Sequence, residues 1–182
     1  MHLRWLVTLA LTVLFACGEE RLAGALPGAS EPLEAAAAMP RVVSLNPSIT
    51  NILVALGATD ALVGVDDWSA RVQPAASALP RVGGLFNPSL EAILALEPDL
   101  VALVPSAQQR DLRDRLDAVG VDVLALANLT LAQVLDSIQL LGARVDRGAA
   151  ATARIEAIRG ALRTTAEHNA GRPRPRTVLV LQ

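Results

Sequence analysis

The sequence predicts an α/β fold: a Rossmann-like parallel sheet with flanking helices. Short apolar runs rich in Val and Leu alternate with longer amphipathic stretches along most of the chain. This alternation is typical of parallel strands joined by helical crossovers. The second observation is a near-repeat, in which segment 46–53 (NPSITNIL) recurs at 87–94 as NPSLEAIL. Each copy follows a strand-like run, so each predicts a strand, a tight turn and a helix.

The residue types of the near-repeat suit a helix start. The side-chain oxygen of Asn46 or Asn87 can accept a free backbone N–H of the first helical turn. The Pro that follows each Asn fits the first helical position, where its missing N–H costs nothing. Helix starts at the carboxyl ends of parallel strands are where open α/β proteins hold ligands.

Hydrophobic periodicity assigns the other elements. We expect strands at 41–45, 62–65, 80–84, 100–104 and 121–126. We expect helices at 47–56, 88–96, 108–119, 131–142 and 147–168, and a polar loop with Trp68 at 66–77. The helix at 131–142 places five apolar residues on one side: Leu131, Val134, Leu135, Ile138 and Leu141. A Pro-rich linker precedes a last strand at Thr177–Leu181, which is either an edge strand of the same sheet or, as we favour, the first strand of a second lobe.

The N-terminus predicts an exported chain. Residues 1–16 have an apolar run after Arg4 and a small residue at the end, as in a secretory signal peptide. The single cysteine follows, and Leu14-Phe15-Ala16-Cys17 resembles a bacterial lipobox, although Phe15 departs from its usual small or aliphatic residue. We favour lipidation of Cys17 over an incidental thiol, because a lone cysteine is unusual in an exported chain. Residues 17–39 are then a lipid-anchored flexible tether.

The remaining boundaries follow from these elements. The N-terminal lobe is expected at 40–130, a helical segment at 131–171, and the linker with the start of the second lobe at 172–182.

Composition and motifs exclude several classes of function. The 182 residues are 52% hydrophobic with net charge −2 and a pI near 5.7, so no basic face for nucleic acid is expected. The chain lacks GxGxxG, GxxxxGK[ST] and GxSxG motifs. Its only histidines are His2 and His168, which is too few for a triad or a protein-held zinc site. Asp66 and Asp67 are expected to be solvated at a loop tip. We therefore expect no enzyme, no intrinsic cofactor and no metal site.

Several segments together resemble the helical-backbone class of ABC-transporter substrate-binding proteins. They are RVVSLNPSIT at 41–50, VGV at 63–65, PRVGG at 80–84, NPSLEAI at 87–93, PDLV at 98–101 and the later helix–Gly–strand step at 116–123. The resemblance implies two α/β lobes joined by one long helix, with cobalamin, a ferric siderophore or haem between them. Helix 147–168 would be the connecting helix, and most of the second lobe would be absent from this chain.

The resemblance also implies roles for particular residues. Trp68, Leu85 and Phe86 would face the ligand cleft; an aromatic ring that only covers the core is the alternative for Trp68 and Phe86. Ser48 would contact the ligand at a helix start, whereas capping is the stronger expectation for the two Asn residues. Glu91 would dock onto arginines of the membrane permease, and it also suits the first turn of a helix electrostatically.

The sequence thus predicts an extracytoplasmic, lipid-anchored solute-binding component of an ABC importer. Cobalamin is the first choice of ligand, followed by an iron–siderophore chelate or haem. A single-lobe scaffold without a high-affinity ligand, or a binder of another small molecule, remains the alternative.

Overall fold

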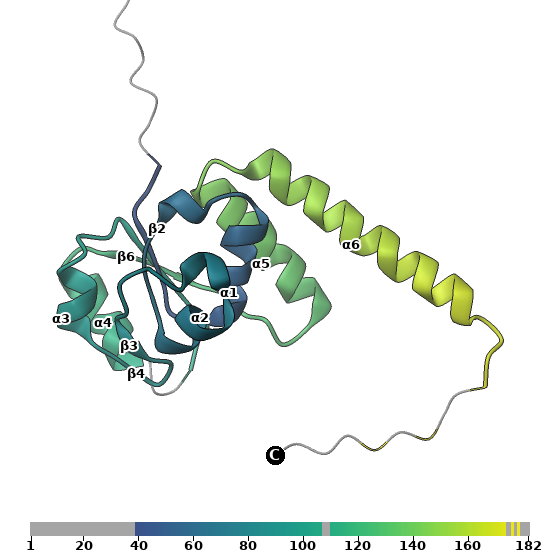
Figure 1. The fold of residues 1–182 in the computed structure, drawn as a ribbon, viewed down its shortest axis with the longest axis horizontal. Coiled ribbons are helices and arrows are strands. Elements are labelled where there is room, and N and C mark those ends of the chain that lie inside the picture. The colour runs from purple at the N-terminus through teal and green to yellow at the C-terminus, as the bar shows by residue number, and fades with distance from the viewer. Residues whose placement is uncertain (1–38, 107–109, 174–175, 177, 179–182) are drawn as a thin grey trace, which may run out of the picture. The chain divides into compact units, whose positions relative to one another are not determined.

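The core of the molecule is a four-stranded parallel sheet in the order β2-β1-β5-β6. The computed structural model describes residues 39–106, 110–173, 176 and 178. The strands are β1 (Val42–Ser44), β2 (Leu62–Val65), β5 (Leu100–Leu103) and β6 (Asp122–Ala125). Their carboxyl ends point toward the lower edge of Figure 1. The predicted α/β class with a parallel sheet is confirmed.

Helices cover both faces of this sheet. They are α1 (Pro47–Ala55), α2 (Asp67–Val72), α3 (Leu90–Leu94), α4 (Arg110–Ala118), α5 (Leu131–Arg144) and α6 (Gly148–Asn169). Short 3₁₀ turns lie at Thr59–Ala61 and Pro74–Ala76. A small antiparallel hairpin, β3 (Gly83–Gly84) with β4 (Asn87–Pro88), continues from the edge of the sheet next to β2.

Side-chain alternation along the strands divides the core in two. Val42 belongs to an apolar cluster with α1, α5 and α6, whereas its neighbour Val43 belongs to a second cluster with α3 and α4. In β5, Leu100 and Ala102 face the first cluster, and Val101 faces the second. Successive residues of a strand point to opposite faces, so a strand buried on both sides needs a continuous apolar run.

The order of the strands creates a topological switch point. From β1 the chain crosses to β2 on one side, and it later enters β5 on the other side and continues to β6. Helix α1, which follows β1, and helix α4, which follows β5, therefore lie on opposite faces. In open α/β sheets this arrangement leaves a crevice at the carboxyl ends of the two central strands.

Two predictions of local structure are wrong. The predicted loop at 66–77 contains helix α2, because the Asp66 carboxylate accepts the N–H groups of Trp68 and Ser69 and caps a helix start. In the second copy of the near-repeat the cap is Ser89 instead of Asn87, since Asn87 and Pro88 form strand β4. Asn46 does cap α1, as predicted.

The long helix α6 is fixed to the lobe through its first half. Ala151 and Ile155 are buried, and Arg147 and Arg154 donate to the Gly57 and Ala55 carbonyls at the end of α1. From residue 161 to 169 every residue of α6 is exposed. The predicted helix at 147–168 is thus present, packed over its first turns only.

Several predictions fall outside the described residues. These are the signal peptide at 1–16, the lipidation site Cys17, residues 17–38 of the tether, and Thr177 and 179–181 of the last strand. In the part that is described, no helix combines the length and apolarity that a membrane crossing needs.

Candidate functional site

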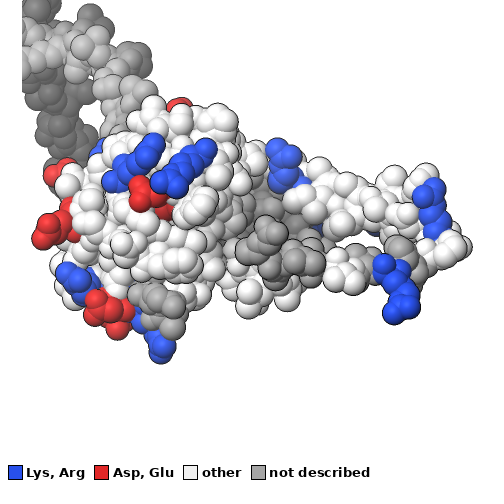
Figure 2. All heavy atoms as spheres, turned by 60° about the horizontal axis from the view of Figure 1, so that its bottom comes forward, with Lys and Arg blue, Asp and Glu red and all other residues white. Residues whose placement is uncertain are grey.

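The carboxyl edge of the sheet brings together residues from three separate turns. Ser48 lies in the first turn of α1, directly after β1, and Trp68 lies in the first turn of α2, directly after β2. Asn128 lies in the loop that follows β6. Figure 2 turns this edge forward, and uncharged surface makes up most of the described lobe in that view. Parallel strands place all their following turns on one edge, so these residues share one end of the lobe.

The hydroxyl of Ser48 is already committed within the lobe. It donates to Oδ1 of Asn46 at 2.7 Å, and the Ser48 backbone N–H donates to the same oxygen at 2.9 Å. The Asn128 side-chain amide donates to Ser48 Oγ at 3.1 Å. A serine hydroxyl has one proton and two lone pairs. Ser48 therefore has acceptor capacity left for a ligand, but no proton unless the cap rearranges.

Trp68 lies on a helix and not in the predicted loop, and its side chain is 52% exposed. The Arg71 guanidinium lies 5.5 Å from the ring centroid, within the range of a cation–π contact. The ring is therefore held on one side by its own helix while half of its surface stays open to a binding partner.

Asp66 is buried, in contrast to the solvated loop tip that we predicted. Its side chain accepts the α2 backbone N–H groups and a short hydrogen bond from the Ser69 hydroxyl. Thr50 of α1 donates to Ser69 at 2.9 Å, and Ser44 of β1 bonds Thr50 at 2.8 Å. All four residues are fully buried. With Ser44 donating to Thr50, Thr50 to Ser69 and Ser69 to Asp66, every hydroxyl in this chain of hydrogen bonds uses its one proton. The chain joins β1, α1 and α2 beneath the carboxyl edge of the sheet.

The hairpin carries Leu85 and Phe86 at its tip. Its entry runs parallel to β2, because Val65 N–H donates to Pro80 O and Val82 N–H donates to Val65 O. Val65 is the last residue of β2, so the hairpin extends past the carboxyl end of that strand. Strand β3 contacts helix α2, which carries Trp68. Phe86 is 66% exposed, and Leu85 is half-buried.

Glu91 is exposed in the first turn of α3, on the sheet face opposite α1. None of the ion pairs found among the described residues includes it. Its carboxylate is therefore open to an external cation, besides its favourable position at a helix start.

Asn128 is the residue that sequence reasoning missed. The signal that would have found it is its position: it is a polar side chain three residues after the end of β6. Leu131 was expected on the packed side of its helix, but it is 51% exposed, and the preceding Leu129 is 89% exposed. Sequence periodicity does not identify which apolar residue at a helix start lies beyond the edge of the core.

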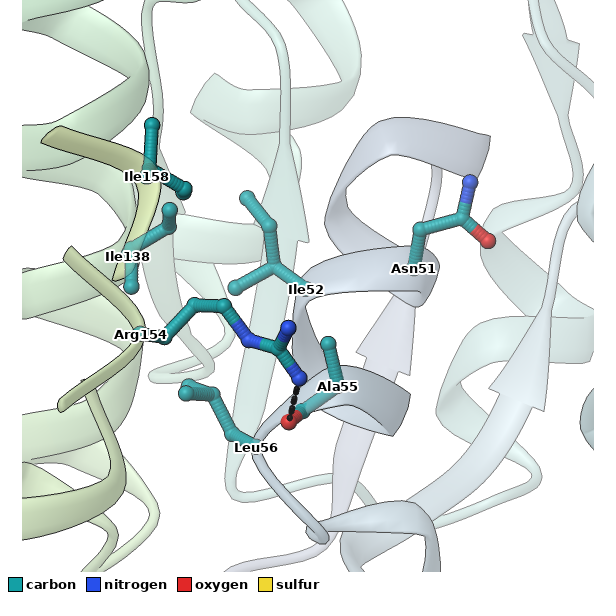
Figure 3. Close-up of a pocket in the computed structure, with 7 residues that line it drawn as sticks. All are labelled: Asn51, Ile52, Ala55, Leu56, Ile138, Arg154 and Ile158. Carbon is teal, nitrogen blue, oxygen red and sulfur yellow. Dashed lines mark hydrogen bonds between the residues drawn. The ribbon is translucent and has the colours of Figure 1, made fainter. Parts of the chain in front are cut away.

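The described residues contain no group of three or more His, Cys, Asp or Glu side chains that could hold a metal ion. A cavity of about 280 Å³ lies between α1, α5 and α6, on the helical face and not at the strand ends (Figure 3). It is lined mainly by aliphatic side chains, and the Arg154 guanidinium crosses it to the Ala55 carbonyl at 3.3 Å.

The sequence that forms this fold matches a known family. Residues 42–182 match the model of the periplasmic binding protein family. The chain belongs to this family. Its members in these comparisons are binding proteins associated with transport and not enzymes, as the sequence predicted. The periplasmic location of such relatives supports the predicted export of this chain.

Named relatives and solved structures of similar sequence or fold bind vitamin B12 or haem. A vitamin B12-binding protein of Vibrio parahaemolyticus is 33% identical over 113 residues, which are 62% of this chain and 38% of that protein. The solved periplasmic vitamin B12-binding protein of Vibrio cholerae gives a TM-score of 0.65 at 26% identity, over 73% of this chain and 52% of that one. A periplasmic haem-binding protein from Pseudomonas aeruginosa gives a TM-score of 0.64 at 30% identity, over 71% and 46%. The chain thus spans about two fifths of the curated relatives that it matches.

Proposed function

We propose that this chain forms the N-terminal ligand-binding lobe of the solute-binding component of an ABC importer, with cobalamin as its ligand. The observation that carries the proposal is the likeness of this lobe to vitamin B12-binding proteins, at 30–33% identity in the curated relatives. The exposed ring of Trp68 at the carboxyl edge supports it, because a large ring system binds well to aromatic and apolar surface.

The physical basis of binding is apolar contact with a few fixed polar groups. Trp68, Leu85 and Phe86 supply the apolar part, and Ser48 supplies an acceptor at a helix start. Cobalamin, haem and ferric siderophores each carry their own metal, so the proposed ligand would bring the metal with it. The chain itself then needs no intrinsic cofactor.

Haem is the second candidate, with ferric siderophores in the same class of chelate. The likeness to the Pseudomonas aeruginosa haem-binding protein favours haem, since its 30% identity is comparable to that of the curated relatives. A lobe without a high-affinity ligand is the remaining alternative.

An absorbance and fluorescence titration tests the ligand. The purified chain is titrated with cyanocobalamin, haemin and a ferric hydroxamate. Trp68→Ala and Phe86→Ala should each weaken binding by about fivefold, the effect of losing a contact worth about 1 kcal/mol. Leu162→Ala, which alters an exposed apolar residue on the far half of α6, should leave affinity unchanged. Absence of binding for all three ligands would overturn the proposal and favour the scaffold.

Delivery to the membrane permease is proposed to use Glu91. Its exposed carboxylate would pair with an arginine of the permease. Glu91→Ala should leave ligand affinity intact and reduce uptake by cells, whereas Glu167→Ala, an exposed carboxylate on α6, should change neither. Loss of affinity together with uptake in Glu91→Ala would contradict docking and point to folding.

Anchoring through Cys17 is proposed for the membrane partner and location. The intact mass of the protein extracted from membranes should carry a lipid increment at an N-terminus that begins with Cys17. Cys17→Ala should release the protein from the membrane fraction. An unmodified mass that persists in the membrane fraction would contradict this anchor.

A further inference from the structure

Asn128 is a polar side chain at the carboxyl edge of the sheet, where it contacts Ser48 of the candidate site. We infer that Asn128 contacts the ligand directly and favours ligands that carry primary amides over ligands that carry only carboxylates. This inference rests on the proposed function and names a specificity-determining residue within it.

The orientation of the Asn128 carboxamide is fixed by Ser48. Its Nδ2 donates to Ser48 Oγ at 3.1 Å, and Ser48 is held in turn by its hydrogen bond to Asn46. This link spans 80 positions of sequence and joins the loop before α5 to the first turn of α1. The Asn128 Oδ1 and second N–H make no hydrogen bond with any described residue. One donor and one acceptor are therefore held in a set direction and left for a partner.

The position of this link follows from the strand order. Strands β1 and β6 are separated in the sheet by β5. The contact between Ser48 and Asn128 therefore crosses the carboxyl end of β5, at the switch point between β1 and β5. Ligands of open α/β proteins lie in that crevice.

Exposed apolar residues follow Asn128 in the chain. Leu129 is 89% exposed, and Leu131 at the start of α5 is 51% exposed. Asn128 itself is half-buried. Small-molecule sites typically combine apolar lining with a few fixed polar groups that set the orientation of the ligand, and this edge has that composition.

The chemistry of the carboxamide gives the preference. A primary amide has donors and acceptors, so it can both donate to Asn128 Oδ1 and accept from its N–H. A carboxylate can only accept, and it would face the partial negative charge of Oδ1. The corrin ring of cobalamin carries primary amides on its rim, whereas haem carries carboxylates. Asn128 therefore discriminates between cobalamin and haem, the two candidate ligands of the proposed function.

The test uses the full chain with Trp5→Phe, so that Trp68 is the only tryptophan. Quenching of its emission is measured with cyanocobalamin and with haemin, both of which absorb where tryptophan emits. Asn128→Leu should weaken cyanocobalamin binding about tenfold, the loss expected from a well-placed hydrogen bond whose partner stays unpaired, and haemin binding less than about twofold. Asn128→Asp should instead weaken haemin binding more than cyanocobalamin binding, because the charge of the aspartate repels the carboxylates of haemin.

Asn169 provides the matched control. It is an exposed asparagine at the end of α6, and its Nδ2 donates only to the Thr165 carbonyl. Asn169→Leu and Asn169→Asp should leave both affinities unchanged. Thermal melts of all variants establish that each one folds.

The outcomes separate the two proposals. Equal losses for both ligands in Asn128→Leu, or no loss for either, would overturn the inference while the proposed function stands. Quenching by haemin alone would also overturn it and leave haem as the ligand. No quenching by either ligand in the Trp5→Phe parent would reject the proposed function, and the inference with it.

Discussion

The contact of Gly142 in α5 with Ala151 in α6 allows a sharp test of how α6 is held. A Cβ atom added at Gly142 in α5 would lie 2.5 Å from the Ala151 Cβ of α6 and 3.1 Å from the Arg147 carbonyl oxygen. The first distance is shorter than real contacts allow, and the second involves backbone that does not move freely. Gly142→Ala must therefore push α6 away from α5.

The magnitude follows from two opposing terms. Overpacking costs about 1–3 kcal/mol, whereas replacing Gly by Ala inside a helix contributes about 1 kcal/mol of stability. We expect Gly142→Ala to lower the free energy of unfolding by about 1 kcal/mol, up to about 2. Gly160→Ala in α6 is the matched control, because its new Cβ would meet only the flexible end of Arg163 at 3.8 Å. That control should raise the free energy of unfolding by about 1 kcal/mol.

Urea denaturation followed by circular dichroism measures both variants. The double variant Gly142→Ala/Ala151→Gly removes the clash, so the two changes should cost less together than the sum of their separate costs. A Gly142→Ala protein that is more stable than the parent would refute the close packing of α5 on α6. Equal effects at positions 142 and 160 would refute it too, because helix propensity alone would then explain both.

Three further substitutions test the contacts beneath and beside the site. Thr50→Val keeps the shape of the side chain but breaks the buried hydroxyl chain, and it should cost about 1–3 kcal/mol in urea denaturation. An unchanged midpoint would mean that the chain contributes nothing. Asp66→Asn should cost a similar amount, because the amide oxygen can still accept the two backbone N–H groups of α2 but the amide nitrogen that replaces Oδ2 cannot accept from the Ser69 hydroxyl; an unchanged free energy of unfolding would contradict the role of that bond. Arg154→Ala should lower the free energy of unfolding by at most about 1 kcal/mol, since the guanidinium is exposed. The control Arg163→Ala should leave it unchanged. Equal denaturation curves for the parent and both variants would show that Arg154 does not fix α6.

The sequence was sufficient to predict an element where a single local feature, such as an apolar run or a helix cap, determines it. The apolar run 62–65 is strand β2 with the same bounds, because a strand buried on both faces needs continuous apolar residues. Asn46 before Pro47 caps α1 as expected, since both residues favour that geometry locally.

Prediction from sequence failed where the same short motif makes different tertiary contacts in its two copies. The second Asn-Pro-Ser became part of a hairpin, because β3 pairs with β4 in the register that joins Gly84 to Asn87. That pairing depends on neighbours across the turn and not on the motif. The prediction of a solvated Asp66 was wrong for a related reason. A polar run near a tryptophan is typical of a loop, but the same segment also suits a six-residue helix capped by Asp66.

The candidate site was only partly predictable. Trp68 and Phe86 stood out because aromatic residues are few, at 2% of the chain, and both prove to be exposed. Asn128 was missed because its importance depends on contact with Ser48, a residue 80 positions away. A sequence shows which residues follow strands, but the order of strands in the sheet decides which of those residues meet.

The hydrogen bonds beneath the carboxyl edge bear on how the lobe would bind. The chain from Ser44 to Asp66 and the link from Asn46 to Asn128 hold α1, α2 and the loop after β6 before any ligand arrives. Ordering side chains on binding costs about 0.5–1.5 kcal/mol for each flexible group, and groups that are already fixed avoid that cost. These bonds engage the side chains of Asn46, Ser48 and Asp66, whereas the exposed Trp68 and Phe86 rings stay open to a ligand. We therefore expect affinity to follow the apolar area that a ligand covers, and selectivity to follow the pairing of its rim with Asn128.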